Sequence, residues 1–226
     1  MHHEVEVLPD HDALSRSAAS AVARWARQAV DAEGAFHFAV SGGRSPWAMF
    51  AELALLDMPW DRTAIYQVDE RVAPVDDPDR NLAHLRRALG DAPARVLPMP
   101  VQEDDLDAAA SRYGDALPPA FHLVHLGIGA DGHTASLVPG DPVLDVRDRP
   151  VAVTTIAYEG RRRMTLTYPA LARARQLLWL VSGEDKRAPV AALLGGDRSI
   201  PAGRVEAAAS LVLLDRSAAP DGVAAD

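Results

Sequence analysis

The sequence of 226 residues is 48% hydrophobic and 24% charged, which allows a sizeable core and excludes intrinsic disorder over most of the chain. Its 32 acidic residues outnumber its 23 basic ones, for a net charge of −9, which argues against a nucleic-acid-binding surface built from clustered cations. The absence of cysteine excludes disulfides, thiol nucleophiles and cysteinyl metal sites. Because no signal-peptide pattern and no apolar run of roughly 20 residues occurs, we expect one cytoplasmic domain over residues 1–226 with no membrane partner.

The elements predicted from apolar spacing alternate between helices and strands. Apolar residues recur at three- and four-residue steps between Leu14 and Val30, which predicts a helix that Gly34 closes. A strand over residues 36–40 follows, and then a glycine-rich turn and a helix over residues 47–56. Further strands are predicted over residues 64–68, 95–99, 121–126, 151–155, 164–167, 176–181 and 211–214, and further helices over residues 79–89, 104–117, 168–174 and 184–194.

This alternation predicts an α/β fold with a mainly parallel sheet and helices on both faces, because parallel strands need crossover connections. Such a sheet binds its ligand beyond the carboxyl ends of the strands. The loops after Val40, Val68, Leu126 and Val181 are therefore the candidate site. The alanine-rich tail over residues 217–226 is predicted to be frayed.

The first of these loops, residues 41–46, reads Ser-Gly-Gly-Arg-Ser-Pro. Its glycines let backbone N–H groups approach an anion, the helix start adds a partial positive charge, and Ser45 offers a hydroxyl. The alternative is a tight turn in which Ser41 or Ser45 caps the following helix. The position at the carboxyl end of a strand favours a phosphate site, although the Walker spacing is absent.

The second loop begins with Asp69, Glu70 and Arg71. A run of charges is usually a solvated loop, but this one lies at the expected ligand edge. There Arg71 could hold a phosphate or a substrate hydroxyl, and Asp69 could accept from sugar hydroxyls or orient a base. For Asn81, which follows shortly after, the sequence favours a polar contact at a helix start over a role as substrate ligand.

The third loop, residues 127–137, contains the spacing Gly-x-Gly-x-x-Gly directly after a strand. A dinucleotide site needs a full helix after the third glycine, whereas Pro139 and Gly140 end this segment within a few residues. The glycines instead hold Asp131 and His133 at the sheet edge, which predicts a positioned acid/base pair. The alternative is structural: Asp131 satisfies N–H groups of the turn, and His133 caps a short helix.

The remaining polar side chains give weaker signals. His122 and His125 point to opposite faces of one strand, and no histidine has the spacing of a metal ligand, so no metal is expected. Lys186 lies in the first turn of a predicted helix, where a cation opposes the helix dipole; it either serves a bound anion or is an ordinary exposed lysine. Residues 161–163 form a run of arginines that is usually a solvated face but could meet a phosphorylated ligand.

Taken together, these motifs resemble the 6-phosphogluconolactonase family. The matching segments span most of the chain in family order and are residues 41–46, 69–71, 81–82, 127–137, 163–167 and Ser182-Gly183-x-x-Lys186. The resemblance implies a modified Rossmann-like α/β fold related to glucosamine-6-phosphate isomerase/deaminase. It also implies metal-independent hydrolysis of 6-phospho-D-glucono-1,5-lactone in the oxidative pentose phosphate pathway, without a cofactor.

The family resemblance leads to expectations about individual residues. His133, oriented by Asp131, would remove a proton from the water that attacks the lactone carbonyl. Substrate contacts are expected from Ser41, Gly42, Gly43, Arg44, Ser45, Asp69, Arg71, Asn81, Gly129, Arg163 and Lys186. The expected partner is thus a phosphorylated sugar lactone, and the chain is expected to be a monomer or a weak homo-oligomer.

Two alternative functions stay open. The first is a deaminase-like isomerase. Deaminases, however, carry a glutamate immediately before the proline that corresponds to Pro139, where this chain has Val138. They also tend to have tyrosine where this chain has Arg71, and both departures favour the lactonase. The second alternative is a non-catalytic sugar-phosphate sensor, since a fold does not by itself dictate chemistry. The intact pair of Asp131 and His133 speaks against it.

Overall fold

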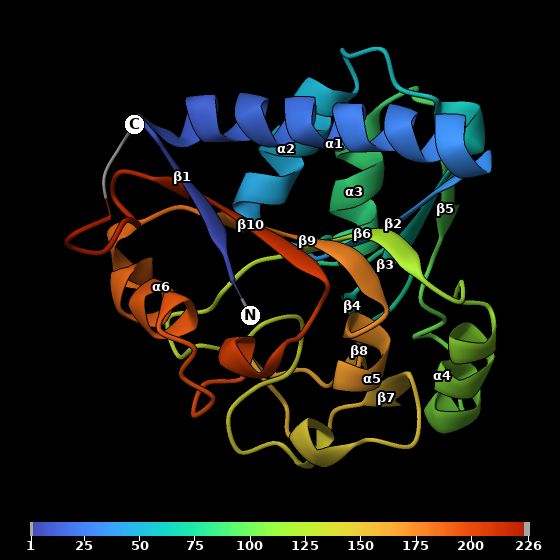
Figure 1. Ribbon diagram of the computed structural model, residues 1–226. Coiled ribbons are helices and arrows are strands. Elements are labelled where there is room, and N and C mark those ends of the chain that lie inside the picture. The colour runs from blue at the N-terminus through green and yellow to red at the C-terminus, as the bar shows by residue number, and fades with distance from the viewer. Residues whose placement is uncertain (1, 224–226) are drawn as a thin grey trace.

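The computed structural model describes residues 2–223, and its main feature is a seven-stranded sheet with helices on both faces (Figure 1). Every neighbouring pair of strands in this sheet is parallel. In sheet order the strands are β1 (Glu4–Leu8), β10 (Ala209–Asp215), β9 (Ala174–Val181), β6 (Phe121–Leu126), β2 (Phe36–Val40), β3 (Thr63–Gln67) and β5 (Arg95–Leu97). The predicted α/β fold with a mainly parallel sheet is confirmed.

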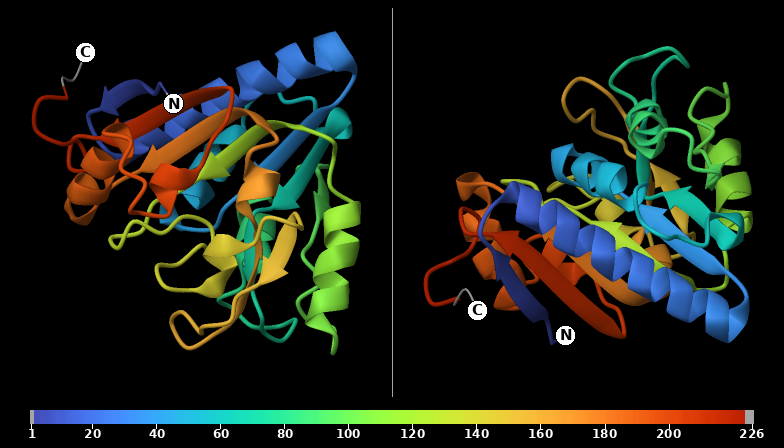
Figure 2. Two further views of the ribbon diagram at one scale, coloured as in Figure 1. Left: turned by 60° about the horizontal axis from the view of Figure 1, so that its bottom comes forward. Right: turned by 90° about the horizontal axis from the view of Figure 1, so that it is seen from above.

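The helices form two layers, one on each face of the sheet (Figures 1 and 2). One layer consists of α1 (His11–Glu33), α2 (Arg44–Leu53) and α3 (Asn81–Leu89), and the other contains α4 (Leu106–Asp115), α5 (Tyr168–Leu171) and α6 (Arg187–Leu194). Each layer packs on its own buried core. Phe38, Phe50 and Leu85 belong to the first core, and Val124 and Trp179 belong to the second.

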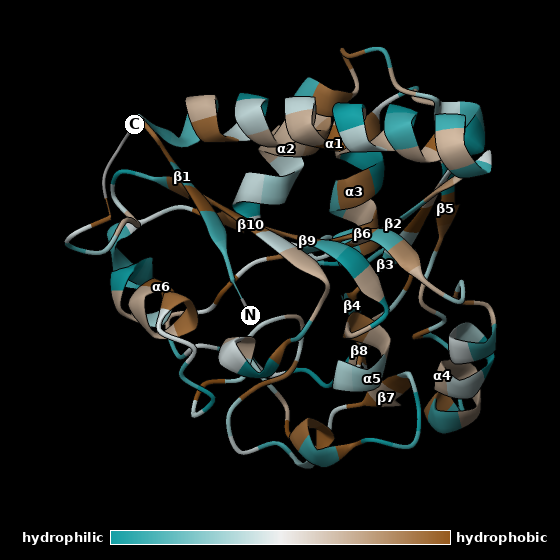
Figure 3. Ribbon diagram, viewed as in Figure 1, coloured by the Kyte–Doolittle hydropathy of each residue, from teal (hydrophilic) through white to brown (hydrophobic). Residues whose placement is uncertain are grey.

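The first helix illustrates how local sequence sets the boundaries of an element. The side chain of Asp10 accepts a hydrogen bond of 2.8 Å from the N–H of Ala13, which caps the start of α1. Gly34 ends the helix in the left-handed conformation with φ 77°. Between these caps, hydrophilic and hydrophobic residues are interspersed along α1 (Figure 3). Its apolar residues, among them Leu14, Ala18 and Val22, are buried in the first core. The helix predicted from Leu14 to Val30 is confirmed.

A second, antiparallel sheet was not predicted. It consists of β4 (Asp69–Arg71), β8 (Arg163–Leu166) and β7 (Val151–Val153), in that order. The connection from β7 to β8 is a hairpin, which is too short for the crossover that a parallel pair needs. The charged segment 69–71, interpreted as a loop, becomes a strand because Glu70 is buried and fully hydrogen-bonded, as described below.

The two ends of the chain also differ in detail from the expectation. The edge strand β1 was not predicted, although its residues alternate polar and apolar side chains as a half-buried strand does; in the structure it pairs with β10. The tail expected to be frayed begins at Ser217, but Ala218 is fully buried and its N–H donates to Asp215 over 2.9 Å. Residues 224–226 of that tail lie outside the described residues. Over residues 2–223, no helix has the length and apolar content that a membrane crossing requires.

His125 occupies the centre of β6, between Val40 of β2 and Leu178 of β9. Its side chain is fully buried, and neither ring nitrogen has a hydrogen-bond partner among the described residues. Burial lowers the pKa of His125 to about 3, because desolvation disfavours the charged imidazolium. His125 is therefore an uncharged core residue. His122 is structural as predicted, since its Nδ1 accepts from the backbone N–H of His37 over 3.0 Å.

We expect His125 to make the folded protein less stable as the pH falls from about 6.5 toward 3. In this window the unfolded chain binds a proton that the folded chain does not, so the free energy of unfolding decreases by up to about 1.4 kcal/mol per pH unit. The substitution His125→Leu removes this contribution and should flatten the slope. Urea unfolding near pH 7.5, 6 and 5 measures it, and identical slopes for the two proteins would contradict the prediction.

Candidate active site

Four loops at the carboxyl edge of the main sheet surround one cavity of about 400 Å³, a size typical of small-molecule sites. The loops follow β2, β3, β6 and β9, which are the four that the sequence singles out. Among the expected site residues, the cavity is lined by Ser41, Gly42, Gly43, Arg44, Ser45, Asp69, Arg71, Asn81, Gly129, His133, Arg163 and Lys186. Asp131 does not line the cavity itself and reaches it through its contact with His133.

The turn between β2 and α2 presents a helix N-terminus to the cavity. Gly43 is the N-cap of α2, and no side chain caps this helix, so neither Ser41 nor Ser45 has the capping role that was the alternative interpretation. The hydroxyl of Ser41 is buried without a hydrogen-bond partner among the described residues. Uncapped N–H groups beside an available hydroxyl are the donors that an anion would use.

Asn81 lies at a helix start, as the sequence favours, and it also borders the cavity, so its role as substrate ligand stays a prediction. It is the first residue of α3, and its side chain lines the cavity. The amide Oδ1 of Asn81 accepts from Arg71 Nη1 over 2.7 Å, and its Nδ2 donates to the backbone oxygen of Asp69 over 3.0 Å. A Cβ at Gly42 would lie 2.2 Å from this Oδ1, so only glycine permits the turn to approach Asn81 this closely.

His133 and Asp131 form a directly bonded pair in the loop after β6. The Nδ1 of His133 lies 2.6 Å from Asp131 Oδ1, and the backbone N–H of His133 donates to the same oxygen over 3.1 Å. Burial alone would raise the pKa of Asp131, but these two hydrogen bonds outweigh it and lower the pKa below its ordinary value. Asp131 is therefore ionised at neutral pH, and it favours the tautomer in which His133 carries its proton on Nδ1.

Gly129 packs directly against this pair, which fills the space that a side chain at position 129 would need. A Cβ at position 129 would lie 2.0 Å from His133 Nδ1 and 2.6 Å from Asp131 Oδ1. The substitution Gly129→Ala must therefore displace the imidazole, and we expect it to lower kcat about 10- to 100-fold, since a shift of about 1 Å can be this costly. The control is Gly34→Ala at the end of α1, where φ is 77° and nothing lies within 4 Å. It should lower stability without changing kcat, and equal kcat values for both variants would contradict the prediction.

Besides Arg44 of α2, the cavity gathers cationic side chains from three further segments. Arg71 comes from β4, Arg163 from β8, and Lys186 from the loop after β9. Arg163 is only 5% exposed, and its Nε has no hydrogen-bond partner among the described residues. Lys186 contacts only its neighbour Asp185 over 2.9 Å among the ion pairs of the described residues. These cations give the cavity a local positive charge within an acidic protein.

Asp69 is a buried carboxyl group in the cavity lining. Ser136 Oγ donates to Asp69 Oδ2 over 2.6 Å, and Asn81 Nδ2 lies 3.3 Å from Asp69 Oδ1. Burial raises the pKa of Asp69 above its ordinary value, although the bond from Ser136 and the charge of Arg163 partly offset this. Asp69 can thus accept hydrogen bonds from a ligand hydroxyl at the wall of the cavity.

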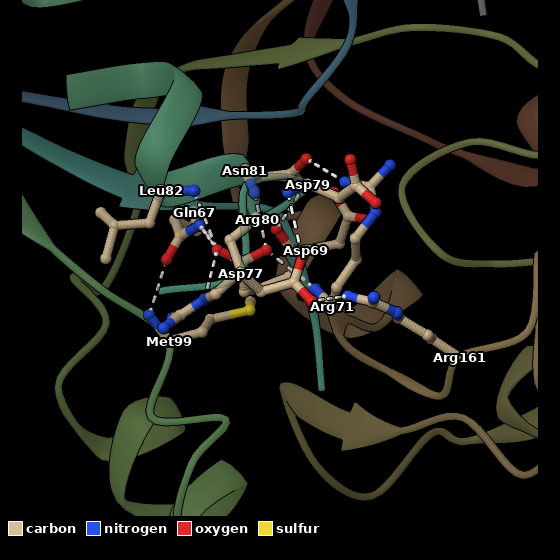
Figure 4. Close-up of polar contacts among 11 residues, drawn as sticks. Gln67, Asp69, Arg71, Asp77, Asp79, Arg80, Asn81, Leu82, Met99 and Arg161 are labelled. Atoms are coloured by element: carbon tan, nitrogen blue, oxygen red, sulfur yellow. Dashed lines mark hydrogen bonds and ion pairs between the residues drawn. The ribbon is translucent and has the colours of Figure 1, made fainter. Parts of the chain in front are cut away.

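Glu70, the middle residue of β4, does not line the cavity, but its carboxylate binds the backbone of two residues that do. Its carboxylate is fully buried and accepts four hydrogen bonds of 2.8 to 2.9 Å, from Gln67 Nε2 and from the backbone N–H groups of Arg71, Asn81 and Leu82. Figure 4 labels the four donor residues and also Arg80, whose Nε lies 3.6 Å from Glu70 Oε2. Two cavity residues, Arg71 and Asn81, are therefore positioned by one buried carboxylate at the start of α3.

Two of the three consecutive arginines lie outside the cavity, and some residues that line it were not predicted from the sequence. Within the run 161–163 only Arg163 lines the cavity, because Arg161 pairs with Asp77 and Arg162 donates to the backbone oxygen of Thr154. The cavity also contains Ser136, Tyr158 and Glu159, which were not predicted. Ser136 lies inside the third loop motif, whereas only Gly160, a turn residue, marks the segment of Tyr158 and Glu159. Within the described part of the chain, no three His, Asp or Glu side chains are grouped to hold a metal ion.

Comparison with known proteins gives consistent matches along almost the whole chain. The family described as glucosamine-6-phosphate isomerases/6-phosphogluconolactonase matches residues 9–213. The chain is 35% identical over 201 residues to a 6-phosphogluconolactonase of Synechocystis sp., with 83% of each chain covered. It is 37% identical to one of Mycobacterium bovis, with 97% of this chain and 98% of the relative covered. A crystal structure of a 6-phosphogluconolactonase from Shewanella baltica has the same fold, with a TM-score of 0.87, 24% identity, and coverage of 95% of this chain and 98% of that chain.

Proposed function

This chain belongs to the family of glucosamine-6-phosphate isomerases and 6-phosphogluconolactonases, and we propose that it hydrolyses 6-phospho-D-glucono-1,5-lactone to 6-phospho-D-gluconate. The observation that carries this proposal is the shared cavity, in which the imidazole of His133 and the uncapped N-terminus of α2 meet. A phosphate held at the helix end tethers the sugar, and the imidazole then acts on the tethered ring. The curated relatives named 6-phosphogluconolactonase support this substrate.

The reaction needs one group that moves a proton. His133 Nδ1 is bonded to Asp131, so Nε2 is the nitrogen that accepts a proton from water. The water oxygen bonds to the lactone carbonyl carbon and gives a tetrahedral intermediate. This intermediate collapses when the bond to the ring oxygen breaks, and His133 returns its proton to that oxygen. The new carboxylic acid releases its own proton to solvent, so the sum is addition of one water across the ester.

We infer that backbone and side-chain groups of the cavity bind the phosphate and the hydroxyls of the sugar. We assign the phosphate to the N–H groups at the start of α2, the hydroxyl of Ser45, and the cations Arg71 and Lys186, all of which line the cavity. Asp69 and Asn81, also in the lining, are suited to the sugar hydroxyls. At this short range, the cavity's own cations outweigh the background net charge of −9.

The test is a turnover assay with lactone generated in situ by glucose-6-phosphate dehydrogenase. Formation of 6-phosphogluconate faster than spontaneous ring opening supports the proposal. Ammonia released from glucosamine 6-phosphate would instead identify a deaminase, against which the apolar Val138 argues. Tight binding of the sugar phosphate without either reaction would identify a sensor. The cytoplasmic location, and the monomeric or weakly oligomeric state, stay predictions.

A further inference from the structure

Tyr158 lies at the tip of the hairpin that joins β7 to β8, and its ring packs against the imidazole of His133. The two rings meet edge to face, with centroids 5.0 Å apart and planes inclined by 61°. Both residues line the cavity. We propose that Tyr158 is a positioning residue for the lactonase reaction, one whose ring holds the His133 imidazole in the orientation that directs Nε2 at the substrate.

The hairpin tip holds Tyr158 firmly. The backbone N–H of Tyr158 donates to the oxygen of Arg161 over 3.0 Å, and the N–H of Arg161 donates back over 3.3 Å. Between them, Glu159 and Gly160 have φ values of 51° and 77°, the pair of left-handed residues that makes the tightest hairpin turn. Arg161 Nη1 also bonds Asp77 Oδ2 over 2.5 Å, which ties the tip to the segment before α3.

Arg163 also contacts the ring of Tyr158. Its guanidinium carbon lies 5.9 Å from the ring centroid of Tyr158, within cation–π range. Its Nη2 also donates to the backbone oxygen of Tyr158 over 3.3 Å. The ring of Tyr158 therefore contacts both a buried cation and the imidazole of His133.

The other contacts of His133 show what the Tyr158 ring contributes to holding the imidazole. Asp131 holds Nδ1, and the absent side chain of Gly129 leaves room for the imidazole on one side. Among the described residues no hydrogen bond holds Nε2, so rotation of the ring is limited by the bond from Nδ1 to Asp131 and by packing. Tyr158 provides that packing on the cavity side. Because this is a contact of the ring, phenylalanine should replace tyrosine, whereas alanine should not.

The experiment compares three variants in the lactone assay. Tyr158→Ala is expected to lower kcat about tenfold, the size of one aromatic contact, with KM for the lactone changed less than about threefold because the phosphate contacts remain. Tyr158→Phe should keep kcat within about threefold of the unaltered protein. The matched control is Ile156→Ala in the same hairpin, which is 49% exposed and outside the cavity lining, and it should leave both constants unchanged.

A proton NMR measurement reports the contact without turnover. The Cε1–H resonance of His133, assigned by its loss in His133→Gln, should be displaced by the tyrosine ring current. It should move toward the free-histidine position in Tyr158→Ala but not in Tyr158→Phe. If Tyr158→Ala does not fold, Tyr158→Leu replaces it, and a leucine variant with unaltered kcat and resonance overturns the proposal.

The possible outcomes separate this inference from the proposed function on which it rests. Lactone hydrolysis by the unaltered protein, together with an unaltered kcat in Tyr158→Ala, overturns only the role of Tyr158. A decrease in kcat in Tyr158→Phe as large as that in Tyr158→Ala also overturns this role, because the effect would then come from the tyrosine hydroxyl and not from the ring. If the unaltered protein does not hydrolyse the lactone, the proposed function fails, while the NMR comparison still decides whether Tyr158 positions the imidazole.

Discussion

Replacing His133 with glutamine is expected to lower kcat for lactone hydrolysis by about 10²- to 10⁴-fold, the usual contribution of a general base. The glutamine amide can still donate to Asp131, so the loop should keep its conformation, but it has no nitrogen that accepts a proton from water. KM should change little, because the helix N-terminus and the cations that bind the phosphate are untouched. The loss should therefore appear in kcat and kcat/KM equally, which marks an interaction made only in the transition state.

Initial rates over a range of lactone concentrations, corrected for spontaneous opening of the ring, measure this effect. His11→Gln is the matched control, because His11 begins α1 and does not line the cavity. It should turn over at the unaltered rate. A His133→Gln variant that keeps most of the activity would contradict the assignment of His133 as the base, and would leave the carboxyl groups of Asp69 and Glu159 as the candidate bases in the cavity lining.

Replacing Glu70 with glutamine is expected to lower the free energy of unfolding by about 3 to 5 kcal/mol, the cost of breaking a buried charged network. The carboxylate accepts from Gln67, Arg71, Asn81 and Leu82. A glutamine replaces one acceptor oxygen with an NH₂ group, which then faces two donors. These buried N–H groups lose their partner, and each costs about 1 to 3 kcal/mol when unsatisfied.

Urea unfolding of Glu70→Gln at neutral pH tests this prediction. Its control is Glu206→Gln, which removes an exposed ion pair with Arg198, both side chains being 65% exposed, and should cost less than about 1 kcal/mol. Because Glu70 also positions Arg71 and Asn81, KM for the lactone should rise in Glu70→Gln. Equal stabilities of the two variants would contradict the role of the buried carboxylate.

Much of the site could be predicted because its residues sit in short local motifs. The turn at Gly42 and Gly43 and the pair Asp131 and His133 are each encoded within a few consecutive residues at a strand end. Since parallel strands bring their carboxyl ends to one edge, the alternation of elements was enough to predict that these loops meet. The role of Asn81 could not be settled in this way, because its contact with Arg71 depends on how α3 is anchored by Glu70.

Local sequence, through apolar spacing, capping residues and glycine turns, determined the helices and central strands and the motifs at their ends. Tertiary structure decided which side chains beyond those motifs belong to the site. The antiparallel sheet of β4, β8 and β7 buries Glu70 and carries Tyr158 to within 5.0 Å of His133 between ring centroids. Such contacts join segments that are distant in the chain, and their energies depend on strand pairing and burial, neither of which is a property of any single segment.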